Sequence, residues 1–341
     1  MSSELKALSQ ITLAALDEEM KSVLNADDNT PGSFYGMIHY HMGWVDEHMQ
    51  PASVHPGKQI RPLLCMLACE AAGGDWRHAL PAAAAIEILH NFSLVHDDIE
   101  DASPTRRGRK TVWTIWGVEQ AINTGDAMFA LAHLAMNRLI ERGVPAPIVV
   151  QALRRFDETC LGLTQGQHDD MDFEKRDVVS VAEYMTMIEG KTAVLVSLST
   201  ELGARIAGAD EATVAHYAQF GLDLGLAFQV KDDILGIWGD ESVTGKSAAT
   251  DITTKKKTLP VLYGLEQNAD LRHLYATANP DADFVRQVIH LLDECGARTF
   301  TQTKASEYSE GSVDHLRAAR PNGRAATALH EITEMLLQRN S

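Results

Sequence analysis

The spacing of hydrophobic residues along the chain is helical in nearly every segment. Alanine, leucine, methionine and glutamate dominate the long stretches, and these residues form helices readily. Alternating runs of β-branched residues, which would predict strands, are missing. The 11 prolines fall mostly at the ends of the helical stretches or between them. The pattern therefore predicts an all-α fold.

Boundary signals place several of these helices. Pro81 opens a long one, because proline is favoured in the first helical turn. Gly73 ends another, and Ser180 with Glu183 forms a capping box that begins a third. The predicted helices span 61–72, 81–102, 113–142, 180–202 and 211–234, with loops at 103–110 and 239–257. The stretch 278–321 is the least regular. We see no repeat and no linker, so a single all-helical domain over 1–341 is expected.

Composition and charge narrow the possible partners. The 341 residues carry a formal net charge of -17, which repels the phosphates of nucleic acids and of anionic lipids. No nucleic-acid partner is therefore expected. No signal peptide and no run of ~18 apolar residues is present, so we expect no transmembrane segment and a cytoplasmic location. Cys65 and Cys69 share one helix face among apolar neighbours and are predicted to be core residues rather than metal ligands.

The first candidate motif is an acidic cluster at the end of the helix that Pro81 opens. Asp97 and Asp101 lie four residues apart on one helix face, with Asp98 beside them, and Arg106 and Arg107 follow in a short loop. Gathered carboxylates suit Mg²⁺, and the planar guanidinium of arginine matches phosphate oxygens. An exposed acidic helix end is the alternative. The apolar turns that precede the cluster argue against it.

The second candidate motif is the pair Asp232 and Asp233, which is flanked by apolar residues and followed by a basic segment. A buried carboxylate pair is costly unless a cation neutralises it. An ion pair with Lys231 would neutralise the pair, and so would a bound metal ion. The recurrence of an acidic pair at the end of a second buried helix favours a shared metal site.

Basic residues supply a third element. Lys58 and Arg61 lie three apart at a helix start, where the helix dipole also attracts anions. A basic surface is the alternative reading. His90 lies two helical turns before Asp97 and shares its helix face, although a lone helical histidine is more often a packed residue. Lys191, followed by Thr192, would by itself be read as a surface lysine.

Taken together, these residues resemble the trans-polyprenyl diphosphate synthase family of farnesyl and geranylgeranyl diphosphate synthases. The resemblance covers about 57–262 and rests on five motifs in the family's order: GKQIRP, LHNFSLVHDDIEDASPTRRGR, GQHDDMDFE, GKT and FQVKDDILGIWGD with TGKSAATD. It implies an isoprenoid-synthase-type helical bundle around a central cavity. It also implies a homodimer and a role in isoprenoid biosynthesis.

The resemblance further implies a prenyltransferase that condenses isopentenyl diphosphate with an allylic diphosphate to a linear trans product. Three Mg²⁺ ions would bind with the allylic diphosphate. Their ligands would come from both acidic motifs: Asp97, Asp98, Asp101, Asp232 and Asp233. The allylic diphosphate would contact four cations: Arg106, Lys191, Lys246 and Lys256. The isopentenyl diphosphate would contact Lys58, Arg61, His90 and Arg107. Thr192 and Gln229 would line the reaction centre.

Two positions qualify this expectation. The family's second motif commonly has a third aspartate at its fifth position, where this chain has Gly236. The outer shell of the metal site is therefore expected to be one carboxylate short. Phe92 and Ser93, five and four residues before Asp97, resemble the floor of the product pocket in C20 geranylgeranyl diphosphate synthases. Aromatic residues at both positions would favour a C15 farnesyl product.

Other functions stay open at this point. A class I terpene cyclase on the same fold needs no isopentenyl site, whereas this chain keeps Lys58, Arg61 and His90. A non-catalytic subunit of a heteromeric synthase would be expected to lose acids or arginines of the first motif, and this chain keeps them. A pure scaffold protein would bury two acidic clusters without a use for them.

Overall fold

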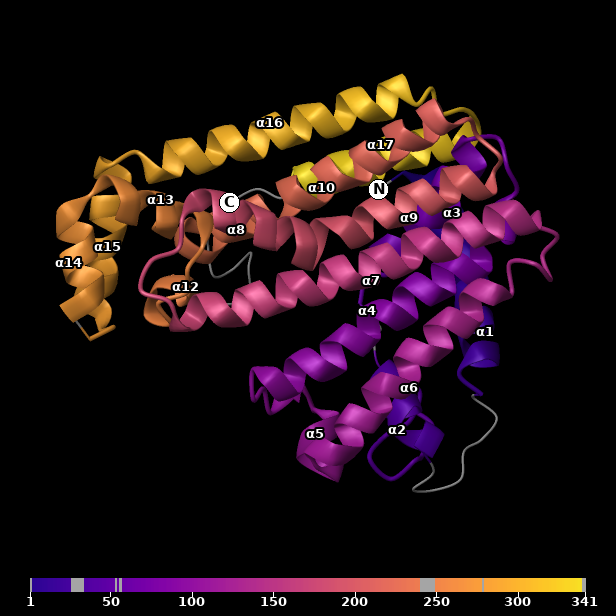
Figure 1. Cartoon of the computed structure of the whole chain (residues 1–341), viewed down its shortest axis with the longest axis horizontal. Coiled ribbons are helices and arrows are strands. Elements are labelled where there is room, and N and C mark those ends of the chain that lie inside the picture. The colour runs from indigo at the N-terminus through magenta and orange to yellow at the C-terminus, as the bar shows by residue number, and fades with distance from the viewer. Residues whose placement is uncertain are drawn as a thin grey trace. The chain divides into compact units, whose positions relative to one another are not determined.

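The computed structural model describes residues 2–25, 34–52, 54, 57–239, 249–277 and 279–338. Within these ranges the chain is almost entirely helical, as Figure 1 shows, which confirms the predicted all-α class. The strands among the described residues form an antiparallel hairpin of β1 (Thr105–Arg106) and β2 (Arg109–Lys110), and Val45 and Pro51 form an isolated antiparallel bridge. No helix in the described ranges is long and apolar enough to cross a membrane.

The chain divides into two compact units, which are described separately. Unit 1 comprises Met1–Arg155, Ser199–Val214 and Pro321–Leu329, and unit 2 comprises Phe156–Leu198, Ala215–Arg320 and His330–Ser341. The expectation of one domain over 1–341 stays a prediction. Four helices contribute residues to both units: α7 (Ala146–Lys175), α9 (Val194–Ile206), α10 (Glu211–Trp238) and α17 (Gly323–Leu337).

Unit 1 is built around α4 (Leu80–Glu100), which packs against α1, α3 and α6. Pro81 lies in its first turn, as predicted, and the alanines that follow are fully buried. Small side chains let the neighbouring helices approach closely, so the position of α4 is fixed along its length. The other elements of unit 1 are α1 (Ser3–Val23), α2 (Phe34–Met42), α3 (Ile60–Ala71), η1 (Trp76–Ala79), α5 (Val112–Trp116) and α6 (Val118–Asn137).

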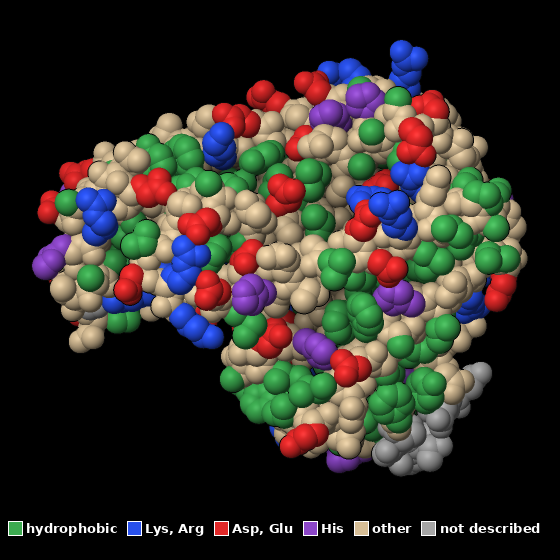
Figure 2. All heavy atoms as spheres, in the orientation of Figure 1, with side chains coloured by type: hydrophobic (Ala, Val, Ile, Leu, Met, Phe, Trp, Pro, Cys, Tyr) green, Lys and Arg blue, Asp and Glu red, His purple; other side chains and the backbone are tan. Residues whose placement is uncertain are grey.

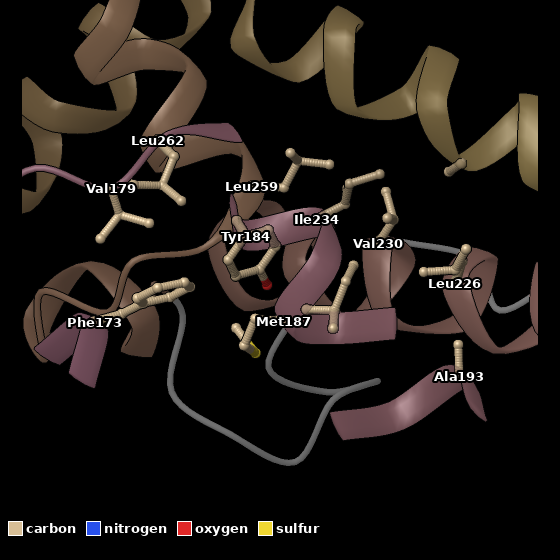
Figure 3. Packing of buried hydrophobic residues seen from close by; sticks show 12 residues of the cluster. Phe173, Val179, Tyr184, Met187, Ala193, Leu226, Val230, Ile234, Leu259 and Leu262 are labelled. Atoms are coloured by element: carbon tan, nitrogen blue, oxygen red, sulfur yellow. The ribbon is translucent and has the colours of Figure 1, made fainter. Parts of the chain in front are cut away.

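Unit 2 contains two clusters of buried hydrophobic side chains. One surrounds Tyr184, Val230, Ile234 and Leu259, and Figure 3 shows these side chains pointing toward one another. The other contains Ile237 and further residues of the C-terminal helices. The remaining elements of unit 2 are α8 (Val181–Ile188), the π-helical turn η2 (Glu189–Ala193), α12 (Thr250–Thr253), α13 (Leu259–Gln267), α14 (Ala269–Thr277), α15 (Ala282–Glu294) and α16 (Ala297–Ala318).

The structure corrects several predicted boundaries. The predicted loop 103–110 contains the β1–β2 hairpin, and the predicted helix 113–142 is interrupted at Gly117, whose φ of +89° is not helical. The predicted helix 180–202 is continuous but widens into η2. The stretch 278–321, expected to be irregular, contains α15 and α16. Asp281 caps α15 and Gly296, with φ of +77°, precedes α16.

The cysteine prediction is confirmed. Cys65 and Cys69 are fully buried in α3, and neither forms a disulfide. Burial raises the pKa of the Cys69 thiol to about 12, with Asp75 and Glu70 adding to the effect, so this thiol stays protonated near neutral pH. These residues belong to the core of unit 1 rather than to a site.

Candidate active site

The acidic cluster of unit 1 is built by the last turn of α4 and the hairpin that follows it. The Arg106 guanidinium donates from Nε to Asp98 Oδ1 at 2.7 Å and from Nη2 to Asp97 Oδ2 at 2.9 Å. Asp98 is 2% exposed, whereas Asp97 is half-buried and Asp101 is exposed. Burial raises the pKa of Asp98, although Arg106 opposes the shift. Asp98 and Asp97 therefore both hold Arg106, and Asp97 and Asp101 are the more exposed carboxylates of the cluster.

A tight turn explains how Arg106 returns to the helix it has just left. Arg107 and Gly108 form the two-residue turn of the hairpin, with φ of +52° and +74°. Positive φ at both central residues is typical of the turns whose twist matches a hairpin. The same turn sends Arg107 in another direction. A Cβ built at Gly57 would lie 3.2 Å from Arg107 Nη2, so Arg107 lies beside the segment that carries Lys58.

A second group of basic residues surrounds His90 in unit 1. Arg61 Nη1 lies 3.5 Å from His90 Nε2, and buried Glu87 lies close enough to both Arg61 and Arg107 for their charges to act on its carboxyl. Burial lowers the pKa of His90 well below its ordinary value, and the positive charges of Arg61 and Arg107 lower it further. The ring is therefore neutral. Arg61 Nε is buried and has no hydrogen-bond partner among the described residues. An unpaired buried donor among cations suits an anionic ligand.

His41 of α2 belongs to the same neighbourhood and was missed by the sequence analysis. Burial, and then the charges of Arg107 and Arg106, lower the pKa of His41 to about 3. Its Nε2 is buried without a partner in the described part of the chain. Nothing in the sequence around His41 signals this position, because tertiary packing alone brings α2 to the arginines.

The two positions predicted to set product length lie on α4, next to α6. The Phe92 ring contacts the rings of Phe129 at 5.2 Å and His96 at 4.9 Å between centroids. The Ser93 hydroxyl donates to the His90 carbonyl at 2.8 Å, so this side chain lies against its own helix. Phe129 therefore extends the aromatic wall that Phe92 begins, a contact between two helices that the sequence analysis did not anticipate.

The acidic pair of unit 2 has unequal surroundings. Asp233 is 3% exposed, and its carboxylate accepts hydrogen bonds from Tyr184 Oη at 2.7 Å, the Leu259 amide at 3.1 Å and Gln229 Nε2 at 3.2 Å. Figure 3 shows the Tyr184 ring inside the buried cluster. Burial raises the pKa of Asp233 to about 6 despite these donors. Asp232, its neighbour on α10, is only half-buried.

The structure joins the predicted reaction-centre residues into one chain of hydrogen bonds. Thr192 Oγ1 donates to Gln229 Oε1 at 3.2 Å, and Gln229 in turn donates to Asp233. Lys191 Nζ lies 2.5 Å from Asp170 Oδ2, at the end of α7. Lys191 and Thr192 both lie on η2, and such wide turns are frequent at functional sites. Lys191 is thus half-buried and paired, not a free surface lysine.

The basic segment after the second motif is only partly described. Lys255 and Lys257 donate to backbone carbonyls, Lys255 to Tyr275 and Lys257 to Phe173 and Arg176. Lys256 is exposed, and its charge reaches Asp233. Lys246 lies outside the described residues. Two of the three consecutive lysines therefore fix the fold, which leaves Lys256 as the one available to a ligand.

The donor set fits a hard divalent cation. Every candidate ligand in the two acidic motifs is a carboxylate oxygen, which is the donor that Mg²⁺ prefers. Within the described ranges, no three histidine, cysteine, aspartate or glutamate side chains converge on one point. Mg²⁺ usually takes one or two carboxylates and completes its shell with water and substrate phosphates, so converging side chains are not required.

Comparisons with known proteins agree with this chemistry. The polyprenyl synthetase family model matches residues 42–292. The chain is 39% identical over 308 residues to a geranylgeranyl diphosphate synthase of Mycobacterium tuberculosis, covering 89% of this chain and 86% of the relative. It is 37% identical over 313 residues, with the same two coverages, to a (2E,6E)-farnesyl diphosphate synthase of Mycobacterium bovis.

Solved structures show the same fold. A polyprenyl synthetase from Streptomyces coelicolor A3(2) superposes with a TM-score of 0.85 at 33% identity, covering 97% of this chain and 99% of that one. A polyprenyl synthase from Caulobacter crescentus CB15, complexed with calcium and isoprenyl diphosphate, superposes with a TM-score of 0.79 at 26% identity, covering 99% and 98%.

Proposed function

Because the chain belongs to the polyprenyl synthetase family and is a trans-prenyl diphosphate synthase, we propose that its product is C20 geranylgeranyl diphosphate. Relatives named for C20 and for C15 products are about equally identical to the chain, so product length rests on the residues near Asp97. The observation that carries the proposal is the pair Phe92 and Ser93. One aromatic wall is present, and the next position is small with its hydroxyl bonded to its own helix.

Each basic group has a distinct task in this proposal. Arg106 and Lys191 bind the allylic diphosphate, together with Lys246 and Lys256. Lys58, Arg61, His90 and Arg107 bind the isopentenyl diphosphate. The buried, unpaired Arg61 Nε and the neutral His90 support this second assignment, because both can donate to phosphate oxygens.

The family is metal-dependent, and the carboxylates present fit that requirement. When bound, up to three Mg²⁺ ions would stabilise the negative charge that gathers on the departing diphosphate. Asp97, Asp101 and Asp232 would be their direct ligands. Asp98 and Asp233 would position the site instead, Asp98 by holding Arg106 and Asp233 by accepting from Gln229.

The reaction proceeds by ionisation, condensation and elimination. The allylic C–O bond breaks to give an allylic cation, and the isopentenyl double bond attacks it. The proton lost at the end passes to the departing diphosphate, so no side-chain base is required. Thr192 and Gln229 hold each other beside Asp233 and present polar atoms to the reaction centre.

One experiment tests the reaction and its product together. The protein is incubated with Mg²⁺, isopentenyl diphosphate and each of the C5, C10 and C15 allylic diphosphates, and product mass is measured. We expect linear C20 diphosphate from every primer. Termination at C15 would reject the proposed length and support the farnesyl alternative. Cyclic hydrocarbon would support the cyclase alternative, and no turnover would support the non-catalytic subunit.

Phe92→Ala tests the floor of the pocket. Removing the ring opens space beside Phe129, so we expect products longer than C20 from the same primers, measured by chromatography and mass. Ser93→Ala is the matched control, because it removes a hydroxyl that already lies against its own helix. Unchanged product length in Phe92→Ala would place the floor elsewhere.

We also propose a homodimer and a cytoplasmic location. Large apolar side chains on α6, on the turn after it and at the start of α7 are more than 40% exposed: Val118, Ile122, Leu134, Ile140 and Val150. Figure 2 shows hydrophobic side chains on the face that carries α5 and α6. Exposed apolar side chains can contact another copy of the chain, and we place the proposed interface on the surface of α6 and the start of α7 that includes Leu134.

A further inference from the structure

Gly236 stands where the second aspartate motif lacks a carboxylate, and the structure shows what fills that place. Gly236 lies one helical turn after Asp232, so the two positions share a face of α10. A Cβ built at Gly236 would lie 2.0 Å from Asp251 Oδ2 and 2.8 Å from Asp251 Cγ. The carboxylate of Asp251 therefore occupies the space that a side chain at position 236 would enter.

The packing around α12 holds Asp251 in this position. Ile252 is fully buried in the same hydrophobic cluster as Ile237, the residue after Gly236. The Asp251 carbonyl also accepts the Lys256 amide at 2.8 Å, which closes the turn after α12. The Asp251 carboxylate is thus aimed at α10 by its buried neighbour and by its backbone.

Asp251 has no charge partner of its own in the described part of the chain. Its half-buried carboxylate forms no hydrogen bond or ion pair with any described residue. A partly desolvated carboxylate without a partner favours a cation. The nearest residue that is predicted to bind a cation is Asp232, which lies one turn from Gly236 on the same helix face.

We propose that Asp251 supplies, from α12, the carboxylate that the second aspartate motif lacks at position 236, and that it binds the hydrated shell of the magnesium ion held by Asp232. The inference rests on the proposed function of Asp232 as a metal ligand. Gly236 is then not a loss in the motif. It is the opening that lets a carboxylate from another element reach the metal.

The test measures metal binding directly. Mn²⁺ replaces Mg²⁺, inorganic diphosphate replaces the substrate, and bound Mn²⁺ is followed by electron paramagnetic resonance. Asp251→Asn keeps the shape and removes the charge, and it should weaken Mn²⁺ binding at least about 10-fold. Asp270→Asn removes the same charge from an exposed position on α14 and should leave binding unchanged. Wild-type affinity in Asp251→Asn would overturn the proposal.

A second experiment moves the carboxylate from position 251 to position 236. Gly236→Asp with Asp251→Gly moves the carboxylate onto α10 and should restore Mn²⁺ affinity to within about threefold of wild type. Gly236→Asp alone places two side chains in one space and should lower the melting temperature measured without metal. A double variant that folds but binds as weakly as Asp251→Asn would also overturn the proposal.

The two proposals can fail separately. A wild-type protein that makes linear prenyl diphosphate while Asp251→Asn binds Mn²⁺ normally would reject the role of Asp251 and keep the function. A wild-type protein that makes no such product, yet whose Mn²⁺ binding depends on Asp251, would reject the proposed product and keep the metal role.

Discussion

At the scale of single residues, neighbouring aspartates in each motif have different environments. In both motifs the first acid is half-buried and the second is almost fully buried, with its oxygens bonded to other groups: Asp98 to Arg106, and Asp233 to three donors. On a helix, adjacent residues point about 100° apart, so one can be partly exposed while the other faces the packed interior. We therefore propose that the first acid of each pair binds the metal and that the buried second acid positions the site, although Asp97 also accepts a hydrogen bond from Arg106.

This proposal predicts that substitutions of the two neighbouring aspartates affect different properties of the protein. Asp233→Asn removes the charge that accepts three hydrogen bonds and leaves an amide facing donors, so it should lower the free energy of unfolding by about 1–3 kcal/mol. Asp232→Asn should leave metal-free stability nearly unchanged and reduce kcat/KM by at least about 100-fold. Urea unfolding and steady-state kinetics measure the two effects. Equal loss of stability in both variants would contradict the proposal.

The lowered pKa of His41 predicts how the stability of the protein depends on pH. The pKa of His41 is about 3 in the folded chain and about 6.5 in the unfolded chain. Between these two pH values the unfolded chain therefore binds a proton that the folded chain does not. The contribution of neutral His41 to the free energy of unfolding is therefore fully present above pH 6.5. It is lost as the pH falls toward 3, by up to about 1.4 kcal/mol per pH unit. His41→Gln should lose less stability than wild type between pH 7 and pH 5 in urea unfolding. The exposed His48→Gln should behave as wild type, and an unchanged slope in His41→Gln would refute the assignment.

At the scale of elements, the sequence predicted most of the helices and the aspartate motifs but not how distant segments meet. Pro81 and the capping box at Ser180 act locally, so their signals can be read directly. The π-turn η2 has no such local signal, and it lies where Gly166 of α7 comes close to the backbone of Lys191. The pairing of Lys191 with Asp170, and the approach of Asp251 to α10, likewise depend on tertiary packing.

The contact between α7 and η2 is testable with two glycines of the same helix. A Cβ at Gly166 would lie 2.2 Å from the Lys191 amide nitrogen, whereas a Cβ at Gly162 would meet only Val194 methyl groups at 3.7 Å or more. Gly166→Ala should therefore displace Lys191, lower the melting temperature and raise KM for the allylic diphosphate. Gly162→Ala should leave both near wild type. Similar effects of the two variants would show that the close contact is not what positions Lys191.

At the scale of the whole molecule, the proposed dimer would have to overcome the net charge of -17 on each chain. Like charges oppose dimerisation, so apolar contacts must supply the attraction. Leu134 is 58% exposed on α6, and Leu134→Glu should shift the proposed dimer toward monomer in sedimentation velocity. Val178→Glu adds the same charge at an exposed apolar position outside the proposed face. A Leu134→Glu protein that sediments as wild type would reject this face as the interface.

The bonds of Arg106 to Asp97 and Asp98 have a consequence for the resting protein. With no divalent ion bound, the guanidinium already serves as a resident counter-ion for the most acidic part of α4. Chelation should then switch the enzyme off without unfolding it, and activity should return when magnesium is added back. A cell short of magnesium would keep a dormant pool of this protein rather than lose it to degradation.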